Sequence, residues 1–229
     1  VDVWNIHMQI LPEGLRYGCF LPYGLSMPLD QQRALAMNLG GCDDPKKDCY
    51  FFYGYNADAA IFEQLIRDFR AWMAARGQRN KPLIISEYGV LFPSTFIANE
   101  FPPAQQQAEG DKKVIAFMQQ TFDFMLTATD PAIGYPGDGN RRVQRWLWFS
   151  LNTPLPTWVP DPVDPRKGSW EGFNGSLYDY AEPTALTPFG ELFRDYVAAA
   201  SSSSVLPTPF PTLEPDRPVS LHVPMVVRR

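Results

Sequence analysis

The sequence predicts an α/β fold with a parallel sheet, because strand-like and helix-like segments alternate along the chain. Three βα units would leave both edges of such a sheet open, so the N-terminal part of the fold is expected to be missing from the chain. The expected strands cover residues 1–10, 82–87 and 141–152, and the expected helices cover 56–77, 111–128 and 187–197.

The chain opens on an apolar strand, VDVWNIHMQI, whose last polar side chains are Asn5, His7 and Gln9. Residues 11–55 follow, rich in Gly and Pro, and are predicted to be a long loop with one short helix at 29–41. Loops of this length inside a domain usually shape a binding site or cover one.

The first long helix is predicted to begin with Asn56 as its N-cap and to stop at Gly77. Its apolar side is expected from residues at helical spacing: Ile61, Leu65, Phe69, Trp72 and Met73. The next helix, 111–128, has its own apolar side in Val114, Phe117, Met118 and Met125.

The C-terminal part is predicted to contain a short hairpin turning at Asn174–Gly175, then a helix with Thr187 as N-cap and Pro188 in its first turn. Beyond that helix the composition shifts to Ser, Pro and Thr. The expected organisation is a domain at 1–198, a Ser/Pro/Thr-rich linker at 199–218 and a short apolar tail at 219–229.

Composition narrows the possible partners of the chain. Its 229 residues are 45% hydrophobic, with a net charge of -5 and a pI near 5.1. This acidic balance argues against nucleic acid as a partner. No apolar run is long enough to span a membrane. Aromatic residues reach 14%, and flat aromatic faces suit sugar rings, although most of them are expected in the core.

Cysteine and histidine usage gives a weaker indication of the redox compartment and of metal binding. Cys42 and Cys49 flank a short polar loop and could close as a disulfide, as in an oxidising compartment, but Cys19 could pair with either of them. The two histidines, His7 and His222, lie far apart in the sequence and neither belongs to a ligand-spaced cluster. No metal and no other cofactor is therefore expected.

One strand ends on an acid. In KPLIISEYGVLFP, residues 81–93, an apolar run stops at Glu87. Strict alternation makes Leu83, Ile85 and Glu87 point the same way. A carboxylate is costly to bury unless it is paired or used, and in βα barrels the C-terminal ends of strands carry the active site. Glu87 could otherwise be an ordinary strand-end acid that caps a helix or pairs with an Arg.

Four segments resemble, in the right order, the last part of the retaining glycoside hydrolases of clan A, which share a (β/α)8 barrel. VDVWNIH is similar to barrel strand 6, KPLIISEYGV to strand 7 and RWLWFSLN to strand 8, and GSLYDYAEPTALTPFGELFRDY resembles the closing stretch. The resemblance covers roughly residues 1–197. It implies that the chain holds only the C-terminal βα units of a TIM barrel, and that the N-terminal half of the barrel is missing.

The resemblance implies that Glu87 is the catalytic nucleophile and that a carbohydrate is the substrate. It implies substrate contacts for His7, Asn5, Trp146, Trp148 and Tyr88, of which Trp148 is nearer the strand end than Trp146. Tyr88 could instead pack behind the strand. Trp158 and Trp170, in the segment after 152, could line a substrate cleft or simply pin a Pro-rich loop.

Retaining hydrolysis also needs an acid/base carboxyl group about 5–5.5 Å from the nucleophile. In the clan this group follows an Asn at the end of strand 4, and Asn99–Glu100 stands in the wrong place for it. The acid/base is therefore expected upstream of this chain. The alternative is a non-catalytic carbohydrate-binding or surface protein on a degenerate or truncated barrel.

The linker and the short tail that ends in Arg are typical of exported proteins. The sequence therefore predicts an extracellular or cell-surface location.

Overall fold

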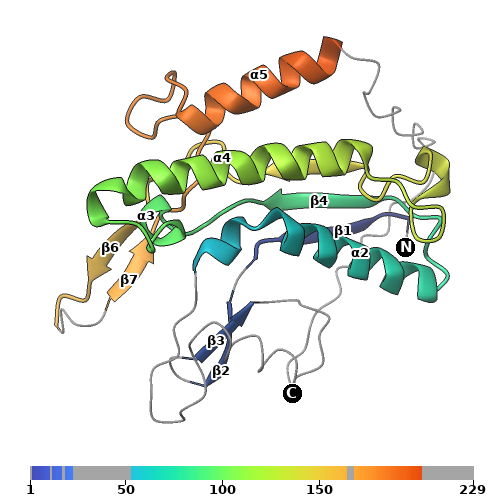
Figure 1. The fold of residues 1–229 in the computed structure, drawn as a ribbon, viewed down its shortest axis with the longest axis horizontal. Helices are drawn as coiled ribbons and strands as arrows, with labels where there is room; N and C mark the ends of the chain where they lie inside the picture. Colours follow the sequence, from blue (N-terminus) through green and yellow to red (C-terminus); the bar gives the residue numbers. More distant parts are fainter. Residues whose placement is uncertain (1, 11, 17–18, 23–52, 164–167, 203–229) are drawn as a thin grey trace.

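The computed structural model describes residues 2–10, 12–16, 19–22, 53–163 and 168–202. Its centre is a parallel sheet of three strands in the order β1-β4-β5 (Figure 1). These strands are β1 (Trp4–Met8), β4 (Leu83–Tyr88) and β5 (Arg145–Trp148). The predicted alternation of parallel strands with helices is thus confirmed. The described residues form an open sheet and contain no closed barrel.

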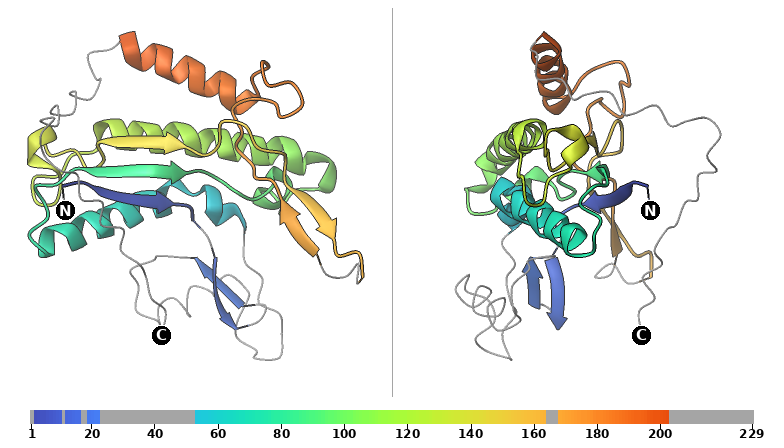
Figure 2. Two further views of the ribbon diagram at one scale, coloured as in Figure 1. Left: turned by 180° about the vertical axis from the view of Figure 1, so that it is seen from behind. Right: turned by 90° about the vertical axis from the view of Figure 1, so that its right-hand side faces the viewer.

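The long helices cover one face of this sheet. Helices α2 (Ala59–Ala75) and α4 (Pro103–Thr127) lie side by side against it, and α5 (Pro188–Ser202) lies beyond α4 (Figure 2). Viewed from behind, the strands stand in front of the helices, and no described helix covers the second face (Figure 2). That second face, carried by β1, β4 and β5, is called the open face below.

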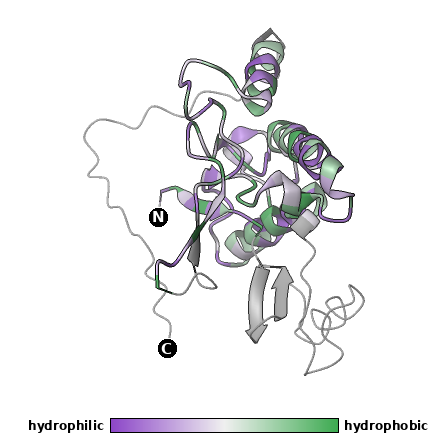
Figure 3. Ribbon diagram, turned by 90° about the vertical axis from the view of Figure 1, so that its left-hand side faces the viewer, coloured by the Kyte–Doolittle hydropathy of each residue, from purple (hydrophilic) through white to green (hydrophobic). Residues whose placement is uncertain are grey.

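The core lies between the sheet and the helices. Figure 3 shows apolar and polar residues alternating around the helical ribbons, as expected for helices with one buried side. The side chains of Leu83, Ile85 and Tyr88 in β4 are fully buried on this side. They meet α2 and α4 through these buried residues: Phe62, Leu65, Ile66, Met73, Val114, Phe117, Met118, Phe122 and Met125.

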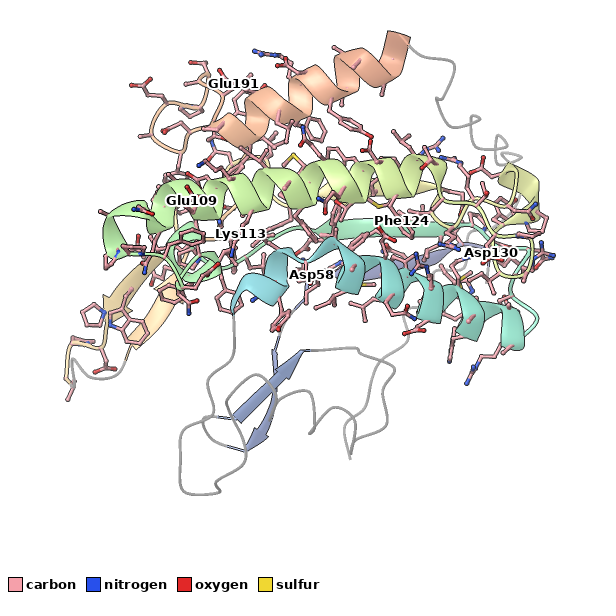
Figure 4. All side chains as sticks on the ribbon, viewed as in Figure 1. Asp58, Glu109, Lys113, Phe124, Asp130 and Glu191 are labelled. Atoms are coloured by element: carbon pink, nitrogen blue, oxygen red, sulfur yellow. The ribbon has the colours of Figure 1, made fainter. Side chains whose placement is uncertain are left out.

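Helix α2 starts two residues later than predicted. Asp58, at the start of the helix in Figure 4, is the N-cap, and its side chain accepts hydrogen bonds from the backbone of Ala60 and Ile61. Asn56 was the wrong choice because it lies buried in a preceding 3-10 turn, Tyr53–Ala57. The predicted stop at Gly77 is confirmed: its φ of 68° is the left-handed conformation that glycine adopts readily.

Helix α4 begins at Pro103, eight residues before the predicted start, after a short helix α3 (Ser94–Ile97). The first two turns carry few apolar residues, so periodicity gave no signal there. Gly110 explains the contact between the two helices. A Cβ at this position would lie 1.9 Å from the carbonyl oxygen of Ser94, so only glycine permits so close a packing.

The segment after β5 differs from the prediction. The hairpin is formed by β6 (Thr157–Pro160) and β7 (Gly168–Glu171), not by a turn at Asn174–Gly175. Asn174 is buried, and its amide donates to the Phe92 carbonyl and the Ser94 hydroxyl. Its role is to tie this segment to the loop after β4, a long-range contact that local turn chemistry cannot reveal.

The start of α5 is confirmed: Pro188 opens the helix, and the Thr187 hydroxyl accepts a hydrogen bond from the Gly190 backbone. The helix continues to Ser202, so the first four residues of the predicted linker, 199–202, are helical. The rest of the linker and the tail lie outside the described residues. Among the described residues, no helix has the length and apolarity needed to cross a bilayer.

Part of the predicted loop at 11–55 is an antiparallel pair of strands, β2 (Pro12–Arg16) and β3 (Cys19–Pro22). The helix expected at 29–41 and the pair Cys42 and Cys49 lie outside the described residues.

Arg70 on α2 is fully buried, and no ion pair joins it to a carboxylate of the described residues. Its guanidinium donates to three backbone carbonyls, those of Ile133, Lys81 and Arg79, at 2.9, 3.0 and 3.2 Å. Burial and the nearby Arg79 lower the pKa of Arg70 to about 10, which leaves it charged at neutral pH. One side chain thus joins α2 to the turn before β4 and to the loop after α4.

Replacing Arg70 with Met keeps the length of the side chain but leaves the three carbonyls without their donor. We expect Arg70→Met to lower the free energy of unfolding by about 3 kcal/mol. Arg67→Met on the same helix removes a partly exposed ion pair with Glu63 and a cation–π contact 6.0 Å from the Phe124 ring, and should cost about 1 kcal/mol. Urea unfolding followed by circular dichroism measures both, and equal losses would contradict the role given to Arg70.

Candidate functional site

Glu87, near the end of the central strand β4, is contacted by two side chains, one from the neighbouring strand β1 and one from the residue directly after it. The Gln9 amide nitrogen donates to Oε1 of Glu87 at 3.1 Å, and Nδ1 of His7 lies 3.5 Å from Oε2. His7 stands directly beside Glu87 in the parallel pairing of β1 with β4. Each carboxylate oxygen therefore has its own nitrogen neighbour, which fixes the orientation of the group.

The face on which Glu87 lies corrects the prediction from strict alternation. Leu83 and Ile85 are fully buried against the helices, whereas the Glu87 side chain is 34% exposed and contacts residues of the open face. The pairing of β4 is irregular here on both sides, between Ile6 and His7 of β1 and between Ile85 and Tyr88 of β4. This irregularity turns Glu87 away from Leu83 and Ile85 and toward the open face.

Strand β1 alternates between exposed and partly buried positions. Asn5 and His7 are exposed, while Trp4, Ile6 and Met8 pack against the core. Asn5 pairs with Ile84, three residues before Glu87. It therefore lies on the same face as the carboxylate but nearer the start of the sheet, whereas His7 reaches Glu87 itself.

The aromatic residues expected at the site lie on the other side of the sheet. Trp146 and Trp148 share one face, as alternation predicted, but both pack against Phe122 of α4. Trp148 is 8% exposed and donates its indole N–H to the Gly175 carbonyl at 2.7 Å.

Tyr88 lies on that same covered side. It is fully buried, 3.4 Å from the Thr121 hydroxyl, and burial raises the pKa of its phenol. Trp148 and Tyr88 are thus buried against the helices and Trp146 is partly buried there, so the substrate contacts expected for these three residues stay predictions that the described positions do not favour.

A steric constraint explains why residue 89, two residues after Glu87, is a glycine. A Cβ on Gly89 would lie 2.5 Å from the carbonyl oxygen of Phe149, which is backbone and has little freedom to move. The backbone N–H of Phe149 in turn donates to the Tyr88 carbonyl at 2.7 Å. Gly89 thus lets the ends of β4 and β5 meet closely beside the carboxylate.

The arrangement fits the chemistry of a single oriented carboxylate. The amide of Gln9 and the imidazole of His7 can donate to it, and the exposed third of its side chain faces outward from the open face. Such a group can attack an electrophilic carbon, accept a proton or accept hydrogen bonds from hydroxyl groups. The described residues contain no group of three or more His, Cys, Asp or Glu suited to a metal ion.

The acid of the Asn99–Glu100 pair does not lie at this site. Glu100, from the Asn99–Glu100 pair, forms an ion pair with Lys113, which Figure 4 shows on α4. It therefore belongs to the helical layer.

Gln9 is the site residue that the sequence predictions did not include. The signal was present, because Asn5, His7 and Gln9 are spaced by two and so share one face of a strand. Only the pairing of β1 with β4 reveals that Gln9, rather than Asn5, reaches the carboxylate.

Comparisons with protein-family models, curated proteins and solved structures found no match for this chain.

Gly89→Ala should disrupt the junction beside Glu87, because the added methyl group meets a backbone carbonyl. We expect a loss of about 2–3 kcal/mol in the free energy of unfolding. Gly77→Ala is the control: it has open space but a φ of 68°, and should cost about 1 kcal/mol. Thermal and urea unfolding of both variants measure the difference, and a Gly89→Ala protein as stable as Gly77→Ala would refute the close approach.

Proposed function

We propose that this chain is part of a glycoside hydrolase of the retaining type, in which Glu87 is the nucleophile. The observation that carries the proposal is the carboxylate held by Gln9 and His7 on the open face, near the carboxyl end of the central parallel strand. In βα barrels the catalytic groups come from this end of the strands.

The arrangement of the sheet supports a (β/α)8 barrel. The strand order β1-β4-β5 follows the order of the chain without reversal, and the connecting helices lie on one face (Figure 2). When each new strand is added on the same side of the sheet, as in a barrel, right-handed connections place all the helices on one face. A doubly wound sheet adds strands in both directions and therefore has helices on both faces. Parallel sheets are normally covered on both sides, so we propose that further strands of the barrel close over the open face.

The proposed reaction begins with attack of a Glu87 oxygen on the anomeric carbon of the sugar. The bond from that carbon to the leaving-group oxygen breaks, and an acid donates a proton to this oxygen. Water then hydrolyses the glycosyl-enzyme, releasing Glu87 as a carboxylate. The hydrogen bond from Gln9 to Oε1 and the His7 imidazole 3.5 Å from Oε2 hold the carboxylate in position for this attack.

The proton donor must lie about 5–5.5 Å from Glu87 across the sugar ring. Glu100 does not fit this role because it pairs with Lys113 in the helical layer. We assign the role to a carboxylic acid from the part of the barrel that covers the open face. His7 and Asn5, both exposed on that face, are the proposed contacts to sugar hydroxyl groups.

Phe149 is the proposed aromatic contact at this site in place of Trp148. It follows the buried Trp148 directly and is partly exposed. Strand alternation places it on the face of Glu87.

The second candidate function is that of a carbohydrate-binding or surface protein that does not hydrolyse its ligand. The observation in its favour is that, among the described residues, Glu87 contacts an amide and an imidazole and no second carboxyl group. An extracellular or cell-surface location suits both functions and rests on the Ser/Pro/Thr-rich composition of 199–218.

The first test compares Glu87→Gln with Glu109→Gln in the full-length gene product. Glu109 is an acid on α4 that pairs with Lys112, and it serves as the matched control. With a panel of aryl glycosides, we expect Glu87→Gln to lower kcat/KM at least about 1,000-fold and Glu109→Gln to leave it unchanged. Hydrolysis that survives Glu87→Gln would rule out the nucleophile, and binding of sugars without any wild-type hydrolysis would favour the second function.

The second test concerns Gln9. Gln9→Glu replaces a donor to Glu87 with a second carboxyl group at about 3 Å, and two such groups resist ionising together. We expect the acidic limb of the pH–rate profile to move to higher pH by about one unit or more. Gln9→Leu should lower kcat about 10–100-fold with a smaller shift. A purely structural role for Gln9 predicts lower stability and no movement of the acidic limb.

A further inference from the structure

We propose that Trp148 is a positioning residue for Glu87 and that it acts together with Asn174. Both side chains are buried, and both hold the backbone that follows Glu87. The set of Trp148, Asn174 and Gly175 is called the brace below. This inference rests on the proposed function, because it assigns the residues that keep the nucleophile of that reaction in place.

Backbone segments from three parts of the chain meet directly after Glu87. The N–H of Phe149, which follows β5, donates to the Tyr88 carbonyl at 2.7 Å. The N–H of Asn174, in the segment after the hairpin, donates to the Leu91 carbonyl at 3.1 Å. The chain at the end of β4 is therefore bonded both to the end of β5 and to the segment after the hairpin.

Two glycines bring these segments into close contact. A Cβ would lie 2.5 Å from the Phe149 carbonyl oxygen if it were added to Gly89, and 3.3 Å from the same oxygen if it were added to Gly175. Gly175 has a φ of 83°, a left-handed conformation that glycine adopts readily. Because the Phe149 carbonyl is packed against both glycines, the backbone after Glu87 has little room to shift without the other two segments.

The indole of Trp148 spans this meeting point on the covered side of the sheet. Its N–H donates to the Gly175 carbonyl at 2.7 Å, and its ring packs edge-to-face against Tyr88 with centroids 5.2 Å apart. Its ring atoms lie 3.7 Å from the position that a Cβ would take on Gly89, and 3.2 Å from that position on Gly175. One buried side chain thus packs against the two residues that follow Glu87 and against the segment that holds them.

Asn174 ties the same segment to the loop after β4. Its side chain is 3% exposed, and its amide nitrogen donates to the Phe92 carbonyl at 2.9 Å and to the Ser94 hydroxyl at 3.1 Å. The Ser94 hydroxyl in turn donates to Asp111 of α4. Removal of the amide would leave a carbonyl of this loop without its donor, so the loop that begins after Glu87 would lose an anchor.

The side chains of the brace carry no charge, so they act on Glu87 through its position. Gln9 and His7 contact the two carboxylate oxygens from the side of β1, and the brace fixes the backbone from the side of β5. A displacement of about 1 Å at a reacting group can cost about 100-fold in rate. Loss of the brace should therefore lower kcat and kcat/KM equally, whereas loss of a substrate contact at Trp148 should raise KM.

The first measurement is kinetic and uses the full-length protein with aryl glycosides. Trp148→Phe keeps an aromatic ring but removes the N–H that Gly175 accepts. We expect it to lower kcat about tenfold or more and to leave KM within about twofold of the wild-type value. Asn174→Ala should have the same effect, because it loosens the same segment without a cavity among the aromatic rings.

Each variant has a matched control that should leave kcat unchanged. Trp4→Phe makes the same substitution under β1, where Trp4 packs against Phe69 and Trp72. Asn152→Ala also removes an amide that donates to a backbone carbonyl, in this case that of Asp179 at 3.1 Å.

The second measurement does not depend on hydrolysis. In protein labelled with ¹³C at the side-chain carboxyl carbon of glutamate, the NMR signal of Glu87 is the one that is missing from Glu87→Gln. We expect this signal to move in Trp148→Phe and in Asn174→Ala, and to keep its position in both control variants.

A rise in KM at unchanged kcat in Trp148→Phe would overturn the proposal in favour of a substrate contact. Equal losses in Trp148→Phe and Trp4→Phe, or an unmoved Glu87 signal in both brace variants, would overturn it as well. If Trp148→Phe does not fold, the comparison of Asn174→Ala with Asn152→Ala gives the answer. A moved Glu87 signal together with full hydrolysis in Glu87→Gln would support the brace and refute the nucleophile, so the two proposals can fail separately.

Discussion

The irregular pairing at the end of β4 is the constraint on which the rest of the structure depends. It places two adjacent side chains on opposite faces. Tyr88 enters the core under α4, where it packs against Phe117 and Trp148, and Glu87 meets Gln9 and His7 on the open face. A regular strand would force Glu87 into line with Leu83 and Ile85, beneath the helices, where an ionised carboxylate would be costly.

The sheet, which the described helices cover on one face only, links the fold to the proposed function. Parallel strands with helices on one face leave a surface that combines polar groups from β1 with apolar groups from β5 such as Leu147, which is 55% exposed. In our proposal this surface is the interior of a barrel, and the exposed Leu147 is covered by its remaining strands. At the carboxyl end of the sheet, Phe149 packs edge-to-face against Phe173 and so ties the segment after the hairpin to the end of β5.

Local signals in the sequence predicted the elements whose ends are set by local chemistry, such as the Gly77 stop and the Thr187 cap. Position within the fold required long-range information. The acid at 87 was found from its place after an apolar run, but its face depended on the irregular pairing with β1. Alternation groups Trp148 and Tyr88 by side without saying which side the helices cover, and in the structure both rings are buried there.

Covalent trapping tests the central claim most directly. The full-length protein is incubated with 2-deoxy-2-fluoro glycosyl fluorides, which slow the hydrolysis of a glycosyl-enzyme, and its peptides are then analysed by mass spectrometry. The account predicts one added fluorosugar on the peptide containing Glu87, and none in the Glu87→Gln protein. A label on another carboxylate, while wild-type hydrolysis is intact, would contradict it.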